Sequence, residues 1–175
     1  MVGSFLASLL SALLYVGMAG FSAGGGQDPA SAFHVETCDA SIWDHVYHGT
    51  FATAQERLTV IDGCITVTGT VEAAFRDPDG DRHIRIRVDA KYKKLLNARN
   101  MLREKGFLVV EPVCELNVTQ KDTVQEGVCQ NFHPNLYRTS MHGKHVSITG
   151  AYVEDQSPNH GWREIHPVTS ITVIN

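Results

Sequence analysis

One pattern constrains the fold of this chain most strongly: apolar and polar residues alternate along two runs that are separated by a tight turn. Within the first run, 59–75, the residues Ile65, Val67, Gly69 and Val71 alternate with three threonines and Glu72. In the second run, 83–89, Ile and Val alternate with His and Arg. Between them Pro78 fixes φ and Gly80 supplies a positive φ. Alternation of this kind is typical of half-buried strands, so a long β-hairpin is predicted here.

Three later runs extend the β pattern. Residues 107–114 are mostly apolar but contain Pro112, which is typical of an edge strand or a bulge. Residues 144–155 alternate again, and residues 162–174 form a closing strand that is interrupted by Pro167. Together with the hairpin, these runs predict five strands.

Two glycines lie in the middle of predicted strands, Gly69 and Gly150. In a small barrel such glycines let strands bend sharply and close. We therefore expect a mostly-β fold, a five-stranded OB-like barrel. A β-sandwich is the alternative fold.

The segments between the strands predict little helix. One short amphipathic helix is expected within 90–105, where the period changes and Gly106 provides a stop. A short helix over 41–48 is a second possibility. The usual OB barrel has its helix between the third and fourth strands. In this sequence that position is taken by a long polar segment, 117–142, which we expect to be stapled by a disulfide.

Four cysteines, Cys38, Cys64, Cys114 and Cys129, follow the N-terminal segment. An even number in an exported chain predicts disulfides, and four cysteines allow three pairings. Spacing favours Cys114–Cys129, which closes a loop of about 15 residues and contributes about 3 kcal/mol in the chain-entropy model. Cys38 and Cys64 would then form the second bridge.

The N-terminal segment indicates export. Residues 1–23 contain no charged side chain, and 5–19 is nearly continuous in apolar and small residues, which is typical of a signal peptide. If it is not cleaved, the segment becomes an N-terminal anchor and the chain's contact with a membrane. We thus expect a leader or anchor (1–23), an N-terminal extension (24–58) and a barrel domain (59–175). The predicted location is extracellular or at the cell surface.

Four segments carry a resemblance to a known family: CITVTGTV (64–71), DGDRHI (79–84), LVVE (108–111) and HGWREIHPV (160–168). They are similar to segments of a family of small exported OB-like proteins of bacteria and archaea that has no established activity. The similarity covers about residues 58–173, and the closing string is its most distinctive part. The resemblance implies the barrel and the export, and it carries over no catalytic residues.

The first candidate binding residues are His83, Arg85 and Arg87. Period-two geometry places all three on one strand face, opposite the predicted core residues. The face formed by strands two and three is the usual binding face of an OB barrel, and arginines there can grip phosphate or carboxylate groups. The alternative interpretation is an ordinary solvated face with Asp81 and Asp89 as ion-pair partners.

The second candidate group is Trp162, Glu164 and His166, which alternation also places on one face. An aromatic ring beside a carboxylate and an imidazole can stack on and orient a sugar or a base. The alternative is structural: Trp162 packs over a barrel end and Glu164 fixes the tautomer of His166. With the intervening apolar residues in the core, Glu164 is expected to point outward or to lie at the rim.

Other chemistry finds little support in the sequence. Asp77, Asp79 and Asp81 have the spacing of a calcium loop, but Pro78 stiffens the run and the glutamate of the twelfth position is missing, so we interpret it as a turn. No complete catalytic, metal or cofactor motif is found, and none is predicted. The formal net charge of −4 argues against sequence-independent binding of nucleic acid.

The sequence therefore favours a non-enzymatic binding module outside the cytoplasm, with a glycan, an oligonucleotide or a partner protein as its ligand. One alternative is a metal-assisted hydrolase or nuclease on the same barrel. Another is a structural component of a cell-envelope assembly, held by the uncleaved N-terminal segment.

Overall fold

The structure is a computed structural model that describes residues 38–174. The predicted leader, 1–23, and the first part of the extension, 24–37, lie outside the described residues. The elements, in chain order, are η1 (Ala40–His45), α1 (Ala54–Arg57), β1 (Leu58–Ala74), β2 (Ile84–Val88), η2 (Ala90–Leu95), α2 (Ala98–Arg103), β3 (Leu108–Val110), α3 (Lys121–Glu126), η3 (Thr139–Met141), β4 (His145–Asp155) and β5 (Arg163–Val173). Within the described residues, no helix has the length and apolar character needed to cross a membrane.

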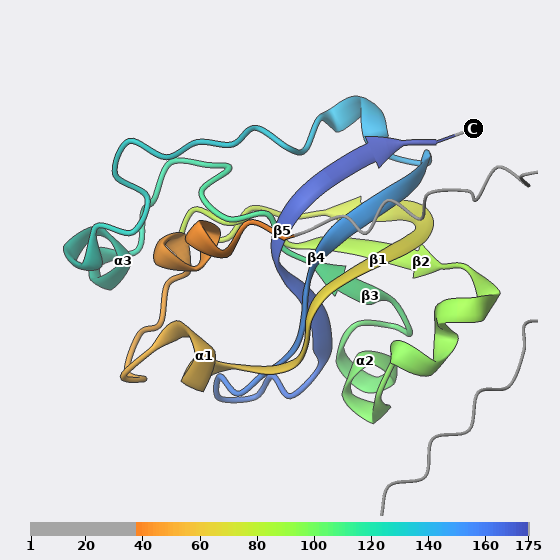
Figure 1. Ribbon diagram of the computed structural model, residues 1–175, viewed down its shortest axis with the longest axis horizontal. Helices are drawn as coiled ribbons and strands as arrows, with labels where there is room; N and C mark the ends of the chain where they lie inside the picture. Colours follow the sequence, from red (N-terminus) through yellow and green to blue (C-terminus); the bar gives the residue numbers. More distant parts are fainter. Residues whose placement is uncertain (1–37, 175) are drawn as a thin grey trace, which may run out of the picture. The chain divides into compact units, whose positions relative to one another are not determined.

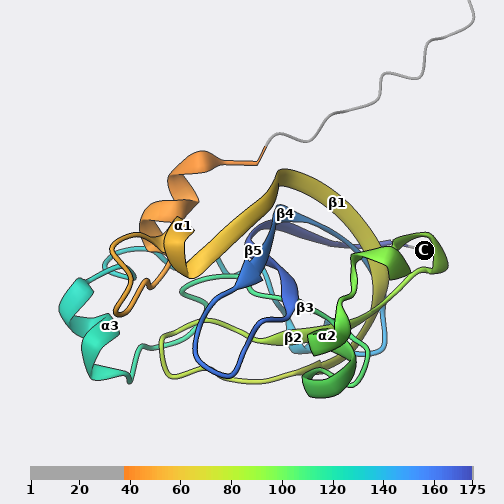
Figure 2. The same ribbon diagram turned by 90° about the horizontal axis from the view of Figure 1, so that it is seen from below.

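The five strands form one mixed sheet that closes on itself in the order β1-β2-β3-β5-β4. The long strand β1 pairs antiparallel with β2 at one edge and with β4 at the other. β3 and β5 run parallel, and β5 returns antiparallel to β4. Figures 1 and 2 show η1, α1 and α3 gathered on one side of the barrel and α2 on the opposite side.

The interior of the barrel contains the residues that the alternation predicts. Ile84, Ile86 and Val88 of β2 are buried, as are the matching apolar positions of β1 and β4. The two mid-strand glycines allow close approach of neighbouring strands. A Cβ on Gly69 would lie 2.5 Å from the carbonyl oxygen of Arg87, and one on Gly150 would lie 2.5 Å from that of Pro167. The mostly-β prediction and its five strands are confirmed.

Three local predictions differ from the structure. The helix expected over 90–105 is split into η2 and α2, because the side chain of Asn97 caps α2 by accepting hydrogen bonds from the backbone N–H groups of Arg99 and Asn100. β3 has three residues and ends before Pro112, which has no N–H to continue the ladder. The polar segment 117–142 contains the helix α3, although the sequence of this segment has no helical periodicity.

Both favoured disulfides are present. The Cα atoms of Cys38 and Cys64 are 5.5 Å apart, and those of Cys114 and Cys129 are 5.4 Å apart. The second bridge helps to form an apolar layer on the outside of the barrel. In this layer η1 and the loop after β3 pack on β4 through one buried cluster: Ile42, Val46, Ala54, Leu58, Val113, Cys114, Cys129, Ala151 and Val153.

Candidate functional site

The structure brings some of the predicted binding residues together and separates others. β3 lies between β2 and β5 in the sheet, so the two predicted groups are not on neighbouring strands. His83 and Trp162 nevertheless meet edge to face, with ring centroids 6.1 Å apart. Arg85 and Arg87 lie further along β2 and are held by other partners.

Those partners are acidic side chains. Arg85 Nε donates to Glu104 Oε2 at 2.7 Å, and the guanidinium also lies over the ring of Phe75. Arg87 forms an ion pair with Glu72, and 68% of the Arg87 side chain is exposed. Along β2, the solvated-face interpretation therefore describes Arg87 best.

Glu164 and His166 are fully buried, which corrects the expectation that Glu164 points outward or lies at the rim. The alternation was correct, because Trp162, Glu164 and His166 do share a face. That face is not open to solvent, since Glu164 pairs in register with Val153, which belongs to the outer apolar layer. Residues of the extension and of the stapled loop form this layer over the strand, and no sequence pattern in either segment predicted it.

The buried side chains of β5 form a polar network. Glu164 Oε2 accepts a hydrogen bond from Trp162 Nε1 at 2.7 Å, and Glu164 Oε1 lies 2.9 Å from His166 Nδ1. His166 Nδ1 is also 3.0 Å from Glu111 Oε2, and His166 Nε2 is 3.4 Å from Asp81 Oδ2. Glu164 thus contacts both Trp162 and His166, whereas the structural interpretation gave it only His166 as a partner.

Burial and crowding shift the pKa values in this network in opposite directions. Burial and the nearby Glu111 carboxylate raise the pKa of Glu164 to about 7. Burial and Asp79 likewise raise the pKa of Asp81 to about 7. Burial opposes the charge on His166, but close contacts with the carboxyl groups of Asp81, Glu111 and Glu164 raise its pKa well above the ordinary value. The network therefore favours the charged form of His166 and the protonated forms of Glu164 and Asp81 more than water would.

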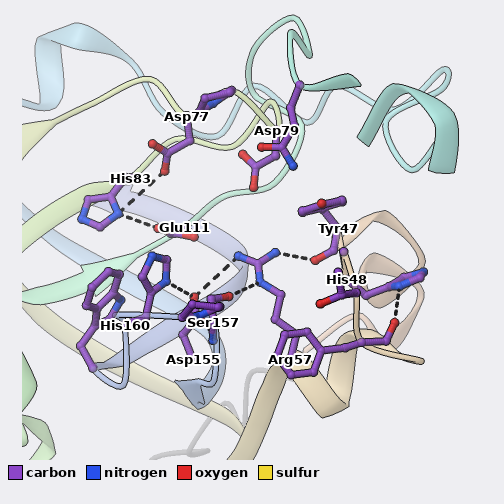
Figure 3. A pocket seen from close by; sticks show the side chains of 17 residues that line it. Tyr47, His48, Arg57, Asp77, Asp79, His83, Glu111, Asp155, Ser157 and His160 are labelled. Carbon is purple, nitrogen blue, oxygen red and sulfur yellow. Dashed lines mark hydrogen bonds and ion pairs between the residues drawn. The ribbon is translucent and has the colours of Figure 1, made fainter. Parts of the chain in front are cut away.

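A pocket of about 580 Å³ opens beside this network. It is formed where two loops of the barrel, 75–83 between β1 and β2 and 156–162 between β4 and β5, meet residues 47–57 of the extension. Figure 3 shows Asp77, His83 and Glu111 on one side, Tyr47 and His48 across from them, and the guanidinium of Arg57 between. The residues that line it are Tyr47, His48, Gly49, Thr50, Phe51, Arg57, Asp77, Pro78, Asp79, His83, Glu111, Gln120, Asp155, Ser157, Pro158, His160 and Trp162.

One wall of the pocket is built around Arg57. Its guanidinium donates to the carbonyl oxygen of Tyr47 and, at 3.2 Å, to Ser157 Oγ, and it lies 3.7 Å from Asp155 Oδ2. Asp155 Oδ2 also bonds to His160 Nδ1 at 2.8 Å. Burial would raise the pKa of Asp155, but His160 and Arg57 lower it below its ordinary value. These contacts hold the wall in place without a ligand.

The opposite wall is built around His83. Its Nδ1 lies 2.7 Å from Glu111 Oε1 and 3.8 Å from Asp77 Oδ2, while its Nε2 lies 3.0 Å from Glu104 Oε2. Burial opposes the charge, but Glu104 and Glu111 raise the pKa of His83 to about 10. Burial and Glu111 raise the pKa of Asp77 to about 6. This wall therefore presents hydrogen-bonding groups whose protonation is set by their neighbours.

The charge on the pocket walls is unbalanced. Four carboxyl groups line it, those of Asp77, Asp79, Glu111 and Asp155, against the one arginine, Arg57. His48, His83 and His160 add imidazoles that can donate or accept. Such walls favour ligands that donate hydrogen bonds or carry positive charge, and they disfavour phosphate groups.

Most of the pocket was not predicted from the sequence. His83 and Trp162 were named, but Arg57, Glu111 and Asp155 are single polar residues without a motif.

Asp77 and Asp79 were singled out and interpreted as a turn. They do form this turn, in which the Gly80 N–H donates to the Asp77 carbonyl oxygen. One signal pointed to them: they lie in the predicted loop between the first two strands, and the OB-like barrel expected from the sequence would use that loop to bind ligands.

Comparison of the chain with models of protein families, with curated proteins and with solved structures gives no match.

Proposed function

We propose that this protein is an exported, OB-like barrel that binds a saccharide in the pocket between its β1–β2 and β4–β5 loops. The closed strand order and the parallel β3–β5 pair support the OB-like class. OB barrels bind oligosaccharides and oligonucleotides through their strand-two and strand-three face and through these same two loops. The pocket at this place is the observation that carries the proposal.

The chemistry of the walls selects between the two ligand classes. Four carboxyl groups against one arginine repel a phosphate backbone, which needs basic partners. The hydroxyl groups of a sugar, in contrast, donate to carboxylates and accept from Arg57 and the imidazoles. A neutral or positively charged saccharide therefore fits better than an oligonucleotide.

Rings in the pocket supply the apolar contacts that a sugar face requires. Tyr47 and Phe51 belong to the extension, and Trp162 lies under His160, with ring centroids 4.0 Å apart. Aromatic rings pack against the C–H faces of sugars and bury large apolar area at low entropic cost. The pocket volume of about 580 Å³ is in the range of small-ligand sites.

The proposed compartment rests on the disulfides and on the N-terminal segment. Two disulfides close within the described residues, and disulfides persist in oxidising environments outside the cytoplasm. An extracellular or cell-surface location agrees with them and with the charge-free N-terminal segment. A saccharide ligand would be available to the protein in either location.

A second candidate, hydrolysis of the bound saccharide, draws on one observation. Asp77 and Asp155 face the same pocket with pKa values shifted in opposite directions, one to about 6 and the other below its ordinary value. Pairs of carboxyl groups separated in this way serve as acid and base in glycoside hydrolysis. Product analysis after long incubation with a bound oligosaccharide distinguishes a hydrolase from a binding protein. Released sugar supports hydrolysis, and an intact ligand supports binding alone.

The test is binding to an oligosaccharide panel, followed by titration of the best ligand. His160→Ala removes a pocket wall, whereas His142→Ala removes an exposed imidazole that bonds to the Glu72 carbonyl oxygen. We expect His160→Ala to weaken binding by about 10-fold, the value of one stacking contact, and His142→Ala to leave it unchanged. Failure of the whole panel to bind, or equal loss in both variants, would overturn the proposal.

A further inference from the structure

Three potential metal ligands converge at one edge of the pocket: His83 Nδ1, a carboxylate oxygen of Asp77 and a carboxylate oxygen of Glu111. All three atoms lie within 4.8 Å of one another, and all three residues line the pocket. We propose that they bind a divalent transition metal ion of the zinc class. This goes beyond the saccharide proposal and does not depend on it.

The spacing of the three atoms suits a shared metal ion. Two ligands at about 2.1 Å from one ion, at a tetrahedral angle, lie about 3.4 Å apart. The distances from His83 Nδ1, 3.8 Å to Asp77 Oδ2 and 2.7 Å to Glu111 Oε1, bracket that value. Small side-chain rotations therefore create the site without movement of the backbone, and the ion displaces the Nδ1 proton of His83, which is released to water.

The surroundings of His83 support the same conclusion. A histidine that binds a metal through one ring nitrogen usually donates its other N–H to a carboxylate, which fixes the ring. His83 Nε2 lies 3.0 Å from Glu104 Oε2, and Glu104 is itself held by Arg85. Nδ1 is thereby directed toward Asp77 and Glu111, where a metal ion would lie.

The remaining oxygen of Glu111 is held as well, since Glu111 Oε2 lies 3.0 Å from His166 Nδ1. Glu111 is buried, whereas about a third of the Asp77 side chain is exposed, at 35%. The three ligands thus leave one side of the ion open to the pocket. Three protein ligands with an open position are typical of zinc sites that bind a water molecule or a substrate.

Charge and donor type point to the class of ion. The acidic excess of the pocket attracts a cation. Ca²⁺ requires six to eight oxygen ligands, and Mg²⁺ also prefers oxygen, whereas an imidazole suits zinc and its neighbours. A second set, Asp81, Glu111 and His166, also lies within 4.8 Å, but Asp81 and His166 are buried and do not line the pocket.

The test is titration calorimetry of the full chain, with both disulfides formed and after treatment with a chelator, using Zn²⁺ as the probe. We expect saturable binding of about one ion per chain. Asp77→Asn and His83→Gln should each weaken it by at least about 10-fold, as even loss of an outer partner does. Asp79→Asn and His160→Gln alter the same pocket without touching the three ligands, and should change it by less than about 3-fold, because screened charges act weakly.

Two results would overturn the inference. Absence of saturable binding would mean that His83 only bridges its carboxylates. Equal weakening by Asp77→Asn and Asp79→Asn would mean diffuse attraction to the acidic pocket. Melting temperatures verify folding, and if His83→Gln does not fold, the comparison of Asp77→Asn with Asp79→Asn decides alone. Because zinc and saccharide binding are measured separately, each proposal stands or falls by itself.

Discussion

Two strands of the barrel carry the same alternating pattern of polar side chains, yet they lie in very different surroundings. Along β2 and its preceding loop, the exposed fraction of the side chain rises from 13% at His83 to 68% at Arg87. Trp162, directly before β5, is buried, and Glu164 and His166 within β5 are completely so. Alternation decides which face a side chain joins, but a second layer of chain decides whether that face is open to water.

The comparison also separates two roles. The buried face of β5 fixes side chains in a network, whereas the end of β2 nearest the pocket, at His83, offers groups to a ligand. The far end of β2, at Arg87, does neither. The stabilities of variants in the two regions test this division.

The largest effect is expected from Glu164→Ala. Removal of the carboxyl group leaves the Trp162 N–H without its buried acceptor and takes away one of the two carboxyl groups that contact His166 Nδ1. Breaking a buried charged network by removal of one member costs roughly 3–5 kcal/mol. Urea unfolding with intact disulfides measures the loss, and Glu164→Gln, which keeps an oxygen acceptor for the indole, should lose less. A loss below about 1 kcal/mol in the alanine variant would show that the network is not needed.

An intermediate effect concerns acid. The pKa of Asp155 is lowered in the folded protein, since hydrogen bonding to His160 and the charge of Arg57 outweigh burial. The carboxylate therefore contributes stability above its unfolded pKa of about 3.9, and this contribution is lost as the pH falls through the lower folded pKa. The free energy of unfolding should fall more steeply below about pH 4 in the wild type than in Asp155→Asn.

Asp89, near the far end of β2, provides the matched control. Its pKa is also lowered, chiefly by a hydrogen bond from Thr68, but 39% of its side chain is exposed. Solvent screens such a group, so Asp89→Asn should follow the acid profile of the wild type closely. If the free energy of unfolding depends equally weakly on acidic pH in Asp155→Asn and Asp89→Asn, the distinction between the two regions is wrong.

The smallest effect is expected from Arg87→Ala. The exposed ion pair with Glu72 contributes little, so the free energy of unfolding should change by less than about 0.5 kcal/mol. Saccharide binding should be unchanged too, although Arg87 was a candidate from the sequence. Loss of binding in this variant would move the site from the pocket to the outer face of β2.

Local patterns were enough to predict the strands, the hairpin and the favoured disulfide pairing. Period-two alternation, the Pro78–Gly80 turn and the spacing of Cys114 and Cys129 each act over short stretches of chain. The burial of Glu164 was not predictable in this way, because the covering layer comes from residues 38–57 and from the loop after β3.

The pocket depended on long-range contacts for the same reason. Arg57 and Asp155 are almost a hundred positions apart, and they meet because β1 and β4 pair along their length. Glu111 becomes a pocket residue because β3 ends beside β5. The aspartates of the first loop were singled out from the sequence as a turn. That interpretation explains their backbone conformation, but it does not predict that their side chains line a pocket.

The most direct measurement is an amide NMR titration of the ¹⁵N-labelled protein with the best oligosaccharide of the panel. The account predicts saturable shifts at residues 77–83, at residues 156–162 and at the indole N–H of Trp162, with none at Arg87 or Glu72. Shifts centred on the outer face of β2, with the two loops unaffected, would contradict it.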